Sequence, residues 1–555
     1  MSFIDTLNRF AQSPVGLDIG RSKFKRDFTH KTTFESGRLI PIYWDEVLPG
    51  DTFKVDMAAV VRSITPAVPV MDNSFLDVFF FWVPNRLCCE HPNDWAAVCG
   101  ENFDSYWAQS TEKTLDNTGN MASLYAFGYI EPGSVANYLG LPVLTSISSG
   151  ADKINLLPFN CYVRIWNEWF RDQNTQAPRG TAQDILTNDS ADFTDRDNVF
   201  RVNRVHDYFT SVLPGPQKAS SVLLPLGTSA PVLTGDVHTV KQDTDATKYS
   251  LKWESSRYNG SSARAFTKDD SGTLKVGTGT PGTLDVTLQP SNLYADLQAA
   301  TAASINSIRL AFALQRFAEK QGLGGSRYRE VLKSFFGVSI PDTTVQVPEY
   351  IGGFRTPLNI TQVLQNSPTS TSPLGATGAF SNTGMSRHGF TKSFNEFGIV
   401  MAVACVRTTQ TYSQGINKKF TRNRRFDFYW PTFANLGEQP VYKSELYAKA
   451  NLTDLKGAVF GYQEAWAEYR YNPSLVTGYF APDANDATLT AWTYTNNFTS
   501  NPVLNSTFMY QPESQVGDTL VVTNGNYQFL GDFAFDVTCV RPMPLYSIPG
   551  LIDHH

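Results

Sequence analysis

Alternating apolar residues near both ends of the chain constrain its fold more than any other feature. From Phe53 to Val61 the odd positions are apolar, and Lys54 and Asp56 separate the first of them. From Phe533 to Cys539 the odd positions are again apolar. A period of two places successive side chains on opposite faces of a strand, so each segment predicts a half-buried β-strand. Strands at both ends, with long stretches between them, predict a mainly β chain: an antiparallel sandwich with long insertions.

Further segments predict strands between these ends. Phe75 to Val83 is almost wholly apolar, which is typical of a strand covered on both faces, and Gly398 to Thr408 is rich in β-formers. In Phe426-Asp427-Phe428-Tyr429-Trp430 the rings at 426, 428 and 430 would point one way. We interpret this run as a strand facing the core.

Two segments predict helices. Residues 161–172 place Tyr162, Trp166 and Trp169 on one stripe, and Asn160 could cap them. Residues 293–321 carry two apolar stripes, formed by Ile305, Ile308 and Phe312 and by Leu310, Leu314 and Phe317. Two stripes indicate burial on more than one side of this helix. Gly322 would end it.

Composition divides the chain into four parts. Residues 1–38 read as a basic N-terminal arm, and residues 39–226 as strands with a helical insertion. Residues 227–285 are rich in Thr, Ser, Gly, Asp and Lys, so they predict a polar surface insertion without a core of its own. Residues 286–555 hold the long helix, loops and the remaining strands, and within them 366–389 read as a second polar loop.

The aromatic residues indicate a chain built to associate. Aromatics make up 13% of the residues and charged residues only 18%, which is little charge for a chain that stays soluble alone. Large rings bury much area at low entropic cost and are enriched at protein contacts. We therefore predict a subunit interface at rings and a cation in the C-terminal third: Trp466, Tyr469, Arg470, Tyr471 and Tyr546.

Two basic clusters are candidates for contact with DNA. One comprises Lys418, Lys419, Arg422, Arg424 and Arg425, next to aromatic rings, and the other Arg21, Lys23, Lys25 and Arg26. Cations beside rings are typical of single-strand binding, but a solvated or subunit-bridging face has the same pattern. The second cluster could equally pair with acidic residues of a neighbour. A net charge of -6 argues against an ordinary nucleic-acid-binding domain, although not against a local basic patch.

The sequence supports no catalytic, cofactor or metal site. The run Gly322-Leu323-Gly324-Gly325-Ser326 lacks the Lys of a phosphate loop, and the seven histidines form no metal-binding pattern. We therefore do not expect an enzyme. The six cysteines, at 88, 89, 99, 161, 405 and 539, form no C-x-x-C pair, so we expect free thiols in a reducing cytoplasm. The N-terminus lacks a signal-peptide pattern, and no apolar run approaches the roughly 20 residues of a membrane span.

Short motifs distributed nearly end to end resemble one family. They include Glu46-Val47-Leu48-Pro49-Gly50, Gly324-Gly325-Ser326-Arg327-Tyr328 and Leu436-Gly437-Glu438-Gln439, with longer matches at 425–431, 460–471 and 541–553. The chain resembles the major capsid proteins of microviruses, small single-stranded DNA phages, and most of all the gokushovirus branch. The resemblance implies an eight-stranded viral jelly roll with large insertions. It also implies a T=1 icosahedral shell of sixty copies around circular single-stranded DNA, assembled in the host cytoplasm and found in the virion.

The resemblance further implies partners and a host-facing insertion. Internal scaffolding, DNA-pilot and small basic packaging proteins would be partners, and the acidic net charge agrees with a need for a basic one. An insertion in gokushoviruses forms protrusions at the threefold axes, which are thought to engage a host surface receptor. By position and composition 227–285 is our candidate, with Trp253 and Tyr258 as anchors in the trimer or for the receptor. Alternatively, both rings pack the insertion onto the shell.

Two rival functions stay open from the residues alone. One is a monomeric β-sandwich that binds carbohydrate, with Trp253 or Trp466 as a stacking platform. The other is a hydrolase on a jelly-roll scaffold, with carboxylates from several strands. Particles of megadalton size would favour the shell, and a persistent monomer would favour the rivals.

Overall fold

The computed structural model divides the chain into two compact units, and we describe each by itself. One unit is Met1–Pro216 with Gln321–His555, and the other is Gln217–Lys320. The structure describes residues 20–88, 129–144, 154–180, 193–218, 305–368, 373–449, 454–482, 489–521 and 527–546, with short strands and single residues between some of these ranges.

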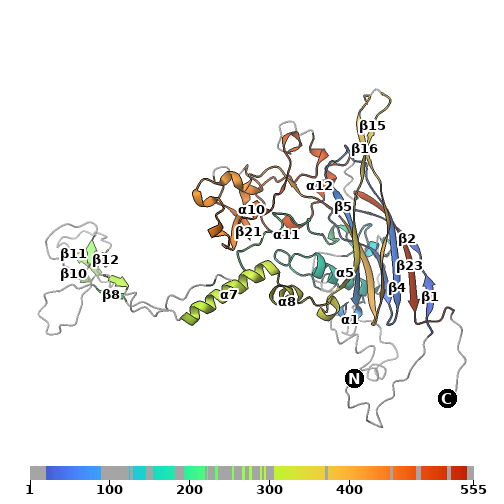
Figure 1. Cartoon of the computed structure of the whole chain (residues 1–555), viewed down its shortest axis with the longest axis horizontal. Coiled ribbons are helices and arrows are strands. Elements are labelled where there is room, and N and C mark those ends of the chain that lie inside the picture. Colours follow the sequence, from blue (N-terminus) through green and yellow to red (C-terminus); the bar gives the residue numbers. More distant parts are fainter. Residues whose placement is uncertain are drawn as a thin grey trace, which may run out of the picture. The chain divides into compact units, whose positions relative to one another are not determined.

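The first unit contains a β-sandwich of two antiparallel sheets (Figure 1). In the first sheet β23 (Phe529–Arg541) lies between β4 (Thr52–Ser63) on one side and β1 (Ser22–Lys25) and β2 (Phe28–Phe34) on the other. The outer edge beyond β4 is β17 (Thr383–Ser393). Because β1 and β2 pair with successive parts of β23, this sheet is four strands wide.

The second sheet has the order β14-β5-β18-β3. Its strands are β3 (Ile40–Val47), β5 (Ser74–Pro84), β14 (Glu349–Pro357) and β18 (Gly398–Thr408). In chain order β2, β3, β4, β5, β14, β17, β18 and β23, the first sheet takes the first, third, sixth and eighth strands. This interleaving is the topology of a jelly roll. The predicted fold class, a mainly β antiparallel sandwich with large insertions, is confirmed.

The core lies between the sheets and follows the predicted alternation. Phe53, Val55 and Met57 are fully buried, whereas Lys54 between them is exposed. β18 and β5 are buried along most of their length, as expected for strands covered on both faces. The Phe80 ring packs against Phe354 and Phe390, at centroid distances of 6.4 and 5.4 Å. Burial of this apolar surface is the main term that holds the sandwich together.

The expected N-terminal arm is wrong for the part that the structure describes. From Ser22 to Phe34 the chain is paired with β23 as β1 and β2, so this segment is an edge of the sheet. The reason is visible in β2, where Phe34 is buried in the core while Lys31 faces outward to Asp532. Alternation of buried and exposed side chains again indicates a strand. The many basic residues of this segment made it read as an arm when only its composition was considered.

The insertion between β5 and β14 supplies short helices to the first unit. They are α1 (Asn85–Cys88), α4 (Val135–Tyr138), α5 (Leu157–Ile165), α8 (Tyr328–Phe336) and α9 (Asp342–Val345), with the two-stranded pair β6 (Leu124–Tyr125) and β7 (Ile154–Asn155), a π-helical turn Trp166–Phe170 after α5 and a 3-10 turn Arg196–Asn198. The predicted helix at 161–172 therefore starts earlier, and Asn160 is not its cap. Instead the Asn160 side chain donates to Cys88 O and accepts from Ala182 N, which ties α5 to α1.

The second unit consists of nested strand pairs and most of a long helix. The pairs are β8 (Val232–Thr234) with β13 (Leu293–Ala295), β9 (Trp253–Ser255) with β12 (Leu288–Pro290) and β10 (Ala265–Lys268) with β11 (Leu274–Gly277). The insertion expected at 227–285 lies within this unit. The long helix α7 (Ile305–Gly324) begins later than predicted, because 293–295 is strand, and Gly322 does not end it. Gly325, with φ at 88°, follows its last residue.

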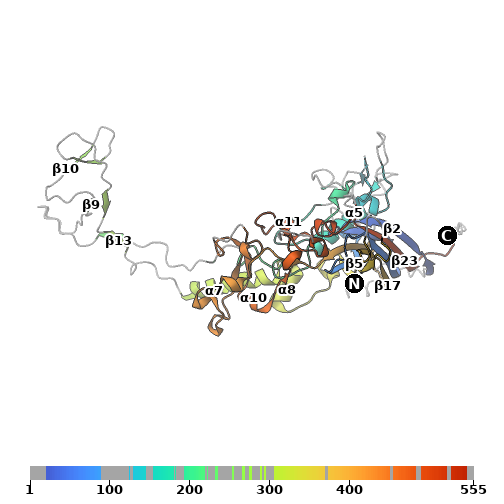
Figure 2. The same cartoon turned by 90° about the horizontal axis from the view of Figure 1, so that it is seen from above.

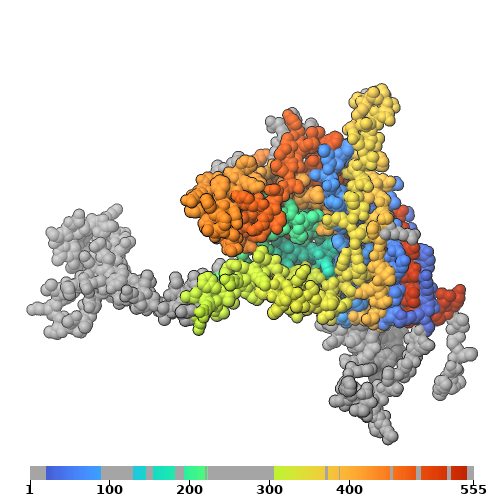
Figure 3. Space-filling view, viewed as in Figure 1, coloured from blue at the N-terminus to red at the C-terminus, as the bar shows by residue number. Residues whose placement is uncertain are grey.

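The insertion between β18 and β23 folds beside the sandwich, and we call residues 409–521 the lobe. Figures 1 and 2 show it in orange and orange-red next to the strands, and Figure 3 shows its rounded surface. Its elements are β19 (Thr411–Tyr412), β20 (Glu438–Tyr442), β21 (Val459–Glu464), α10 (Ala467–Arg470), β22 (Ser474–Leu475), α11 (Ser506–Met509), α12 (Ser514–Gly517) and 3-10 turns at Lys418–Thr421, Arg425–Asp427, Pro431–Phe433, Lys443–Glu445, Gly478–Phe480 and Thr490–Trp492. Tyr208 and Phe209 join it in a second core with Tyr412, Phe460 and Phe508.

Two further expectations concern loops and thiols. The polar loop expected at 366–389 is wrong over much of its length, because β16 (Thr377–Ser381) pairs with β15 (Ile360–Leu364) and β17 begins at Thr383. This polar sequence lacks the apolar residues that would have indicated strands. Its antiparallel partners nevertheless satisfy the backbone hydrogen bonds of these strands. The described cysteines, Cys88, Cys161, Cys405 and Cys539, are buried free thiols. Within the described ranges, no helix is both long and apolar enough for a membrane span.

Candidate functional site

Exposed rings and cations are concentrated in two segments of the lobe, residues 420–430 and 469–471, and we call this group the aromatic–basic surface. Phe420 is 83% exposed and Phe426 67%, which is unusual for rings of this size. The surface comprises Phe420, Arg424, Arg425, Phe426, Phe428, Tyr429, Trp430, Tyr469 and Tyr471. It joins the predicted DNA-contact cluster and the predicted interface rings, which are about forty residues apart in the chain.

The strand predicted for 426–430 is wrong, because local polar contacts bend the backbone into turns. The Asp427 carboxylate accepts hydrogen bonds from the backbone N–H of Asn423 and of Arg424, at 3.0 and 3.1 Å. Lys456 Nζ donates to the same carboxylate at 2.9 Å. The Asn423 N–H and the Lys456 ammonium stabilise the charged form, so the pKa of Asp427 falls to about 2. Pro431 then opens the next 3-10 turn.

Stacked arginines hold the exposed rings in place. The Arg425 guanidinium lies 5.3 Å from the Trp430 ring centroid and 6.0 Å from that of Phe426. Arg422 lies 4.4 Å from the Tyr469 ring and 5.7 Å from Phe428. Such contacts order side chains that solvent would otherwise leave mobile. The two arginines therefore pack against four of the exposed rings.

The five cations of the predicted DNA-contact cluster have different surroundings. The Arg422 side chain is only 8% exposed, and it donates to Glu468 Oε1 and to the Tyr469 hydroxyl, both at 2.7 Å. Lys418 Nζ donates to Pro440 O, and Lys419 Nζ to Asn472 Oδ1. Arg424 and Arg425 are exposed. The structure therefore gives Arg422 a role inside the lobe and leaves Arg424 and Arg425 on its outside.

The prediction that Trp466 is an exposed interface residue is wrong. It is only 5% exposed, its Nε1 donates to Phe433 O at 2.9 Å, and its ring meets Tyr429 edge-on. Its backbone is in the left-handed region, with φ at 66°. One of the polar neighbours that indicated exposure, Glu468, is itself buried. Tyr469, Tyr471 and Tyr546 are exposed, as an interface requires. Arg470 forms an ion pair with Glu464 at 2.8 Å.

Two buried carboxylates lie under the aromatic–basic surface and were not identifiable from the sequence. Glu445 and Glu468 line a cavity of about 250 Å³ with Tyr208, Tyr412 and Lys418. Glu445 accepts from Tyr442 N and from the Tyr208 hydroxyl. Burial raises the pKa of Glu445 to about 7, and the nearby Glu468 charge adds to this. No local motif signals the pair, since its partners lie far apart in the chain.

The other basic cluster is exposed on the edge of the sandwich. Arg21, Lys23, Lys25 and Arg26 all face solvent. Lys25 pairs with Asp27 at 2.9 Å, and Arg26 pairs with Asp45. The acidic partners of these two residues are thus in the same chain.

The two predicted protrusion residues are in the second unit. Trp253 opens β9 opposite Pro290, and Tyr258 lies outside the described residues.

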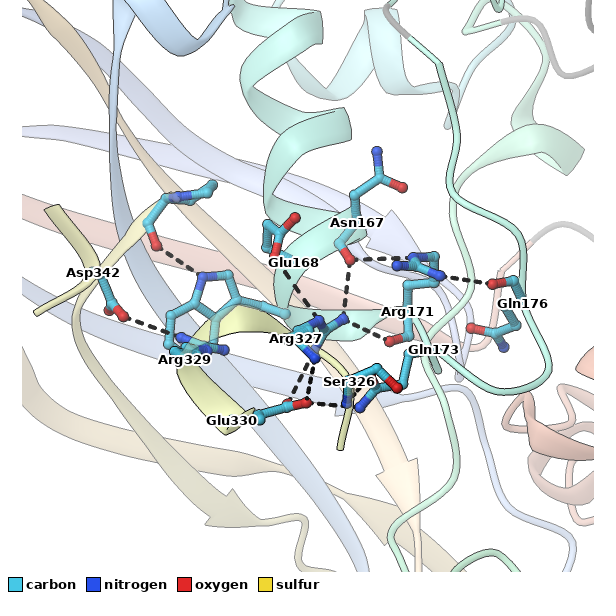
Figure 4. A network of polar contacts seen from close by, with 12 residues as sticks. Asn167, Glu168, Arg171, Gln173, Gln176, Ser326, Arg327, Arg329, Glu330 and Asp342 are labelled. Atoms are coloured by element: carbon cyan, nitrogen blue, oxygen red, sulfur yellow. Dashed lines mark hydrogen bonds and ion pairs between the residues drawn. The ribbon is translucent and has the colours of Figure 1, made fainter. Parts of the chain in front are cut away.

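The glycine-rich run near residue 324 forms a joint between helices. Figure 4 shows Arg327 among the Glu168 and Glu330 carboxylates and the backbone carbonyls of Asn167 and Arg171. The backbone N–H of Ser326 donates to Gln173, and that of Arg327 to Glu330. The amides of Ser326 and Arg327 are therefore occupied by side chains, and these contacts fix the start of α8. Within the described residues no group of three or more His, Cys, Asp or Glu side chains could hold a metal ion.

Comparison with known proteins adds a family and relatives. The model of a family described as "Capsid protein (F protein)" matches residues 14–551. Capsid protein VP1 of Chlamydia phage 1 is 36% identical, over 98% of this chain and 98% of its own length. Capsid protein VP1 of Bdellovibrio phage phiMH2K is 37% identical over 98% and 97%, and that of Spiroplasma virus 4 is 33% identical over 97% and 96%.

Proposed function

Because this chain belongs to the capsid protein (F protein) family, we propose that sixty copies of it form a T=1 icosahedral shell around circular single-stranded DNA. It is a structural protein of the virion that assembles with copies of itself, and it is not an enzyme. The finer features, namely the shell symmetry, the DNA and the host contact, are supported by separate observations.

The aromatic–basic surface supports subunit contact most directly. Its rings are 41–83% exposed and are held by arginines and local turns. Interface centres are enriched in aromatic residues and Arg, and ordered rings lose little entropy when a partner covers them. We assign Tyr469, Tyr471 and Phe420 to contact with a neighbouring subunit, and Tyr546, which follows β23, to a second contact.

The size of the particles tests the shell. Expressed with its scaffolding partner, the chain should give megadalton particles in light scattering and closed icosahedral shells in electron micrographs. Changing Phe420 to Ala should lower the particle yield about tenfold, because an exposed ring at an interface centre contributes about 1–2 kcal/mol. Val60, an exposed apolar residue of the sandwich, provides a matched control when changed to Ala. A persistent monomer of the unchanged chain would contradict the shell and favour a monomeric binding module.

For DNA, we assign contact to Arg424 and Arg425, beside exposed rings on which bases could stack. Changing both to Ala should lower the DNA content per particle and reduce the salt dependence of binding by about two phosphate contacts per subunit. The control changes Lys54 and Arg62, two exposed cations of the sandwich. Equal DNA content in both variants would leave Arg424 and Arg425 with a role between subunits.

For the host, we assign attachment to 227–285, as a protrusion at the threefold axes. Its polar composition and its place in a separate compact unit support this assignment. Deleting 227–285 should spare the shells but abolish binding to host cells. Shells that fail to form while attachment survives would contradict the assignment.

A further inference from the structure

The long helix α7 buries its small residues and exposes its large ones. Ala311 and Ala318 are each 8% exposed, and Gly322 is also buried. The backbone N–H of Lys218 donates to Ala318 O, so a second segment of the chain runs along this face. In contrast Leu310 is 60% exposed and Phe312 59%. A surface helix ordinarily turns its large apolar side chains toward its own core.

The exposed large residues occupy two separate flanks. A helix advances about 100° per residue, so Leu310, Leu314 and Phe317 form one flank. Phe312 and Leu323 lie on the opposite flank, about 160–180° around the axis from Leu314, and the half-buried Ile308 borders that flank. Between the flanks, opposite the buried small face, runs an exposed basic ridge of Arg309, Arg316 and Lys320.

We propose that α7 packs between the α7 helices of two neighbouring copies of this chain, one flank against the opposite flank of the next, in a closed three-membered ring. Two different flanks call for two neighbours. A twofold contact would use the same patch on both copies, whereas a contact between unlike patches forms a ring where its rotation closes, and the threefold axis of the proposed shell would close it. The ring rests on the proposed shell, in which this helix follows the insertion at the threefold axis.

The exposed area fits such a contact. Each half-exposed Leu or Phe side chain leaves roughly 100 Å² of apolar surface, so the two flanks expose roughly 500 Å² per copy. Because each flank meets a different neighbour, these side chains supply roughly 250 Å² to each contact, about a third of the roughly 800 Å² that one partner contributes to a standard interface. The basic ridge stays in solvent, where the like charges of three copies are screened.

Engineered cysteines test the ring in assembled shells. Phe312 and Leu314 point to opposite sides of the helix, so two cysteines there cannot pair within one chain. The double variant Phe312→Cys with Leu314→Cys should give covalent trimers on oxidation. Each single variant should stay monomeric, because residues of one flank do not meet each other. Covalent dimers from either single variant, or no trimer from the double variant in intact shells, would overturn the ring.

A charge placed on a flank gives a second measurement. Leu314→Asp should lower the yield of trimers and shells at least about tenfold, because the carboxylate would lose its water in the contact. Arg309→Asp puts the same group on the basic ridge and should change the yield less than about twofold. Equal effects of the two variants would contradict the ring. If the double cysteine variant gives covalent trimers and neither it nor the unchanged chain forms shells, the shell fails and the ring stands.

Discussion

Two aromatic runs of this chain have similar composition and opposite surroundings. In β5, Phe80 and Phe81 are almost fully buried, 0% and 1% exposed, between the sheets and the helices of the first insertion. In the lobe, Phe426 and Phe428 are 67% and 50% exposed on 3-10 turns. The difference lies in the backbone. A strand with partners on both sides directs its rings into a core, whereas capped turns direct them into solvent.

The comparison shows that an aromatic run is not by itself a core signal. In the sandwich the backbone of β5 is hydrogen-bonded to strands on both sides, and its rings add core packing to that sheet. In the lobe Asp427 satisfies the backbone amides of its own turn. Because that carboxylate accepts the hydrogen bonds of these amides, the segment needs no partner strand. Its rings stay exposed and could contact another molecule. One run stabilises the subunit, and we propose that the other joins subunits.

The largest expected effect is on the free energy of unfolding. It would contradict the comparison if changes in the β5 run and in the lobe run had equal effects. Phe80→Ala should destabilise the unassembled chain by about 3–5 kcal/mol, because it opens a cavity beside Phe354 and Phe390. Phe420→Ala in the lobe should change the free energy of unfolding by about 0.5 kcal/mol or less. Urea denaturation of both unassembled variants measures the difference. Equal losses would mean that the lobe rings support the fold of the subunit.

A pH titration sharpens the contrast between the surface of the lobe and its interior. The folded pKa of Glu445 is about 7, above the ordinary carboxyl value of about 4.3, so the folded state binds more protons between these values. Stability from this group is therefore present below about pH 4.3 and is lost as the pH rises to 7. Glu445→Gln should be more stable than the unchanged chain by about 1–3 kcal/mol at pH 8.

The control for this titration is Glu464→Gln, at a carboxylate that is 40% exposed and pairs with Arg470. It should follow the unchanged chain throughout the titration. Parallel unfolding curves for Glu445→Gln and the unchanged chain from pH 4 to 8 would mean that Glu445 is ionised without penalty, and hence better solvated than its burial indicates.

The smallest expected effect concerns the turn that exposes the rings. Asp427→Ala should cost about 1 kcal/mol, because two backbone amides lose their acceptor at a partly exposed site. The contribution of Asp427 is present above its ordinary pKa of about 3.9 and is lost as the pH falls through 2. Hydrogen exchange at the amides of Asn423 and Arg424 should accelerate. Lys456→Ala removes only the ion pair, and it should leave that exchange nearly unchanged.

Period-two alternation was a reliable guide to the sandwich because it reports directly on burial. The strands predicted around Phe53, Gly398 and Phe533 are β4, β18 and β23, within a few residues of their ends. Helix limits were less accurate, since α5 begins before Asn160 and α7 after Ala295. Tertiary contacts decide both limits: the Asn160 side chain is used to join α1, and 293–295 pairs with β8.

The candidate site was predicted by residue type and not by arrangement. Rings and cations of the lobe were singled out, but their division into buried and exposed members was not. Trp466 and Arg422 are buried by partners 33 and 46 residues away, Phe433 and Glu468. The sandwich holds a similar case in Asp77, which accepts from Arg355 and Arg407 on two neighbouring strands. Pairings of this kind leave no local pattern.

The order of residues alone determined the strand-forming segments and the family, because alternation and short motifs are properties of neighbours in the chain. Only the folded chain decided which rings and charges meet solvent. That outcome depends on which distant segments meet through hydrogen bonds and apolar faces in the folded state, as Trp466 meets Phe433 and Arg422 meets Glu468, and no short stretch of sequence carries this information by itself.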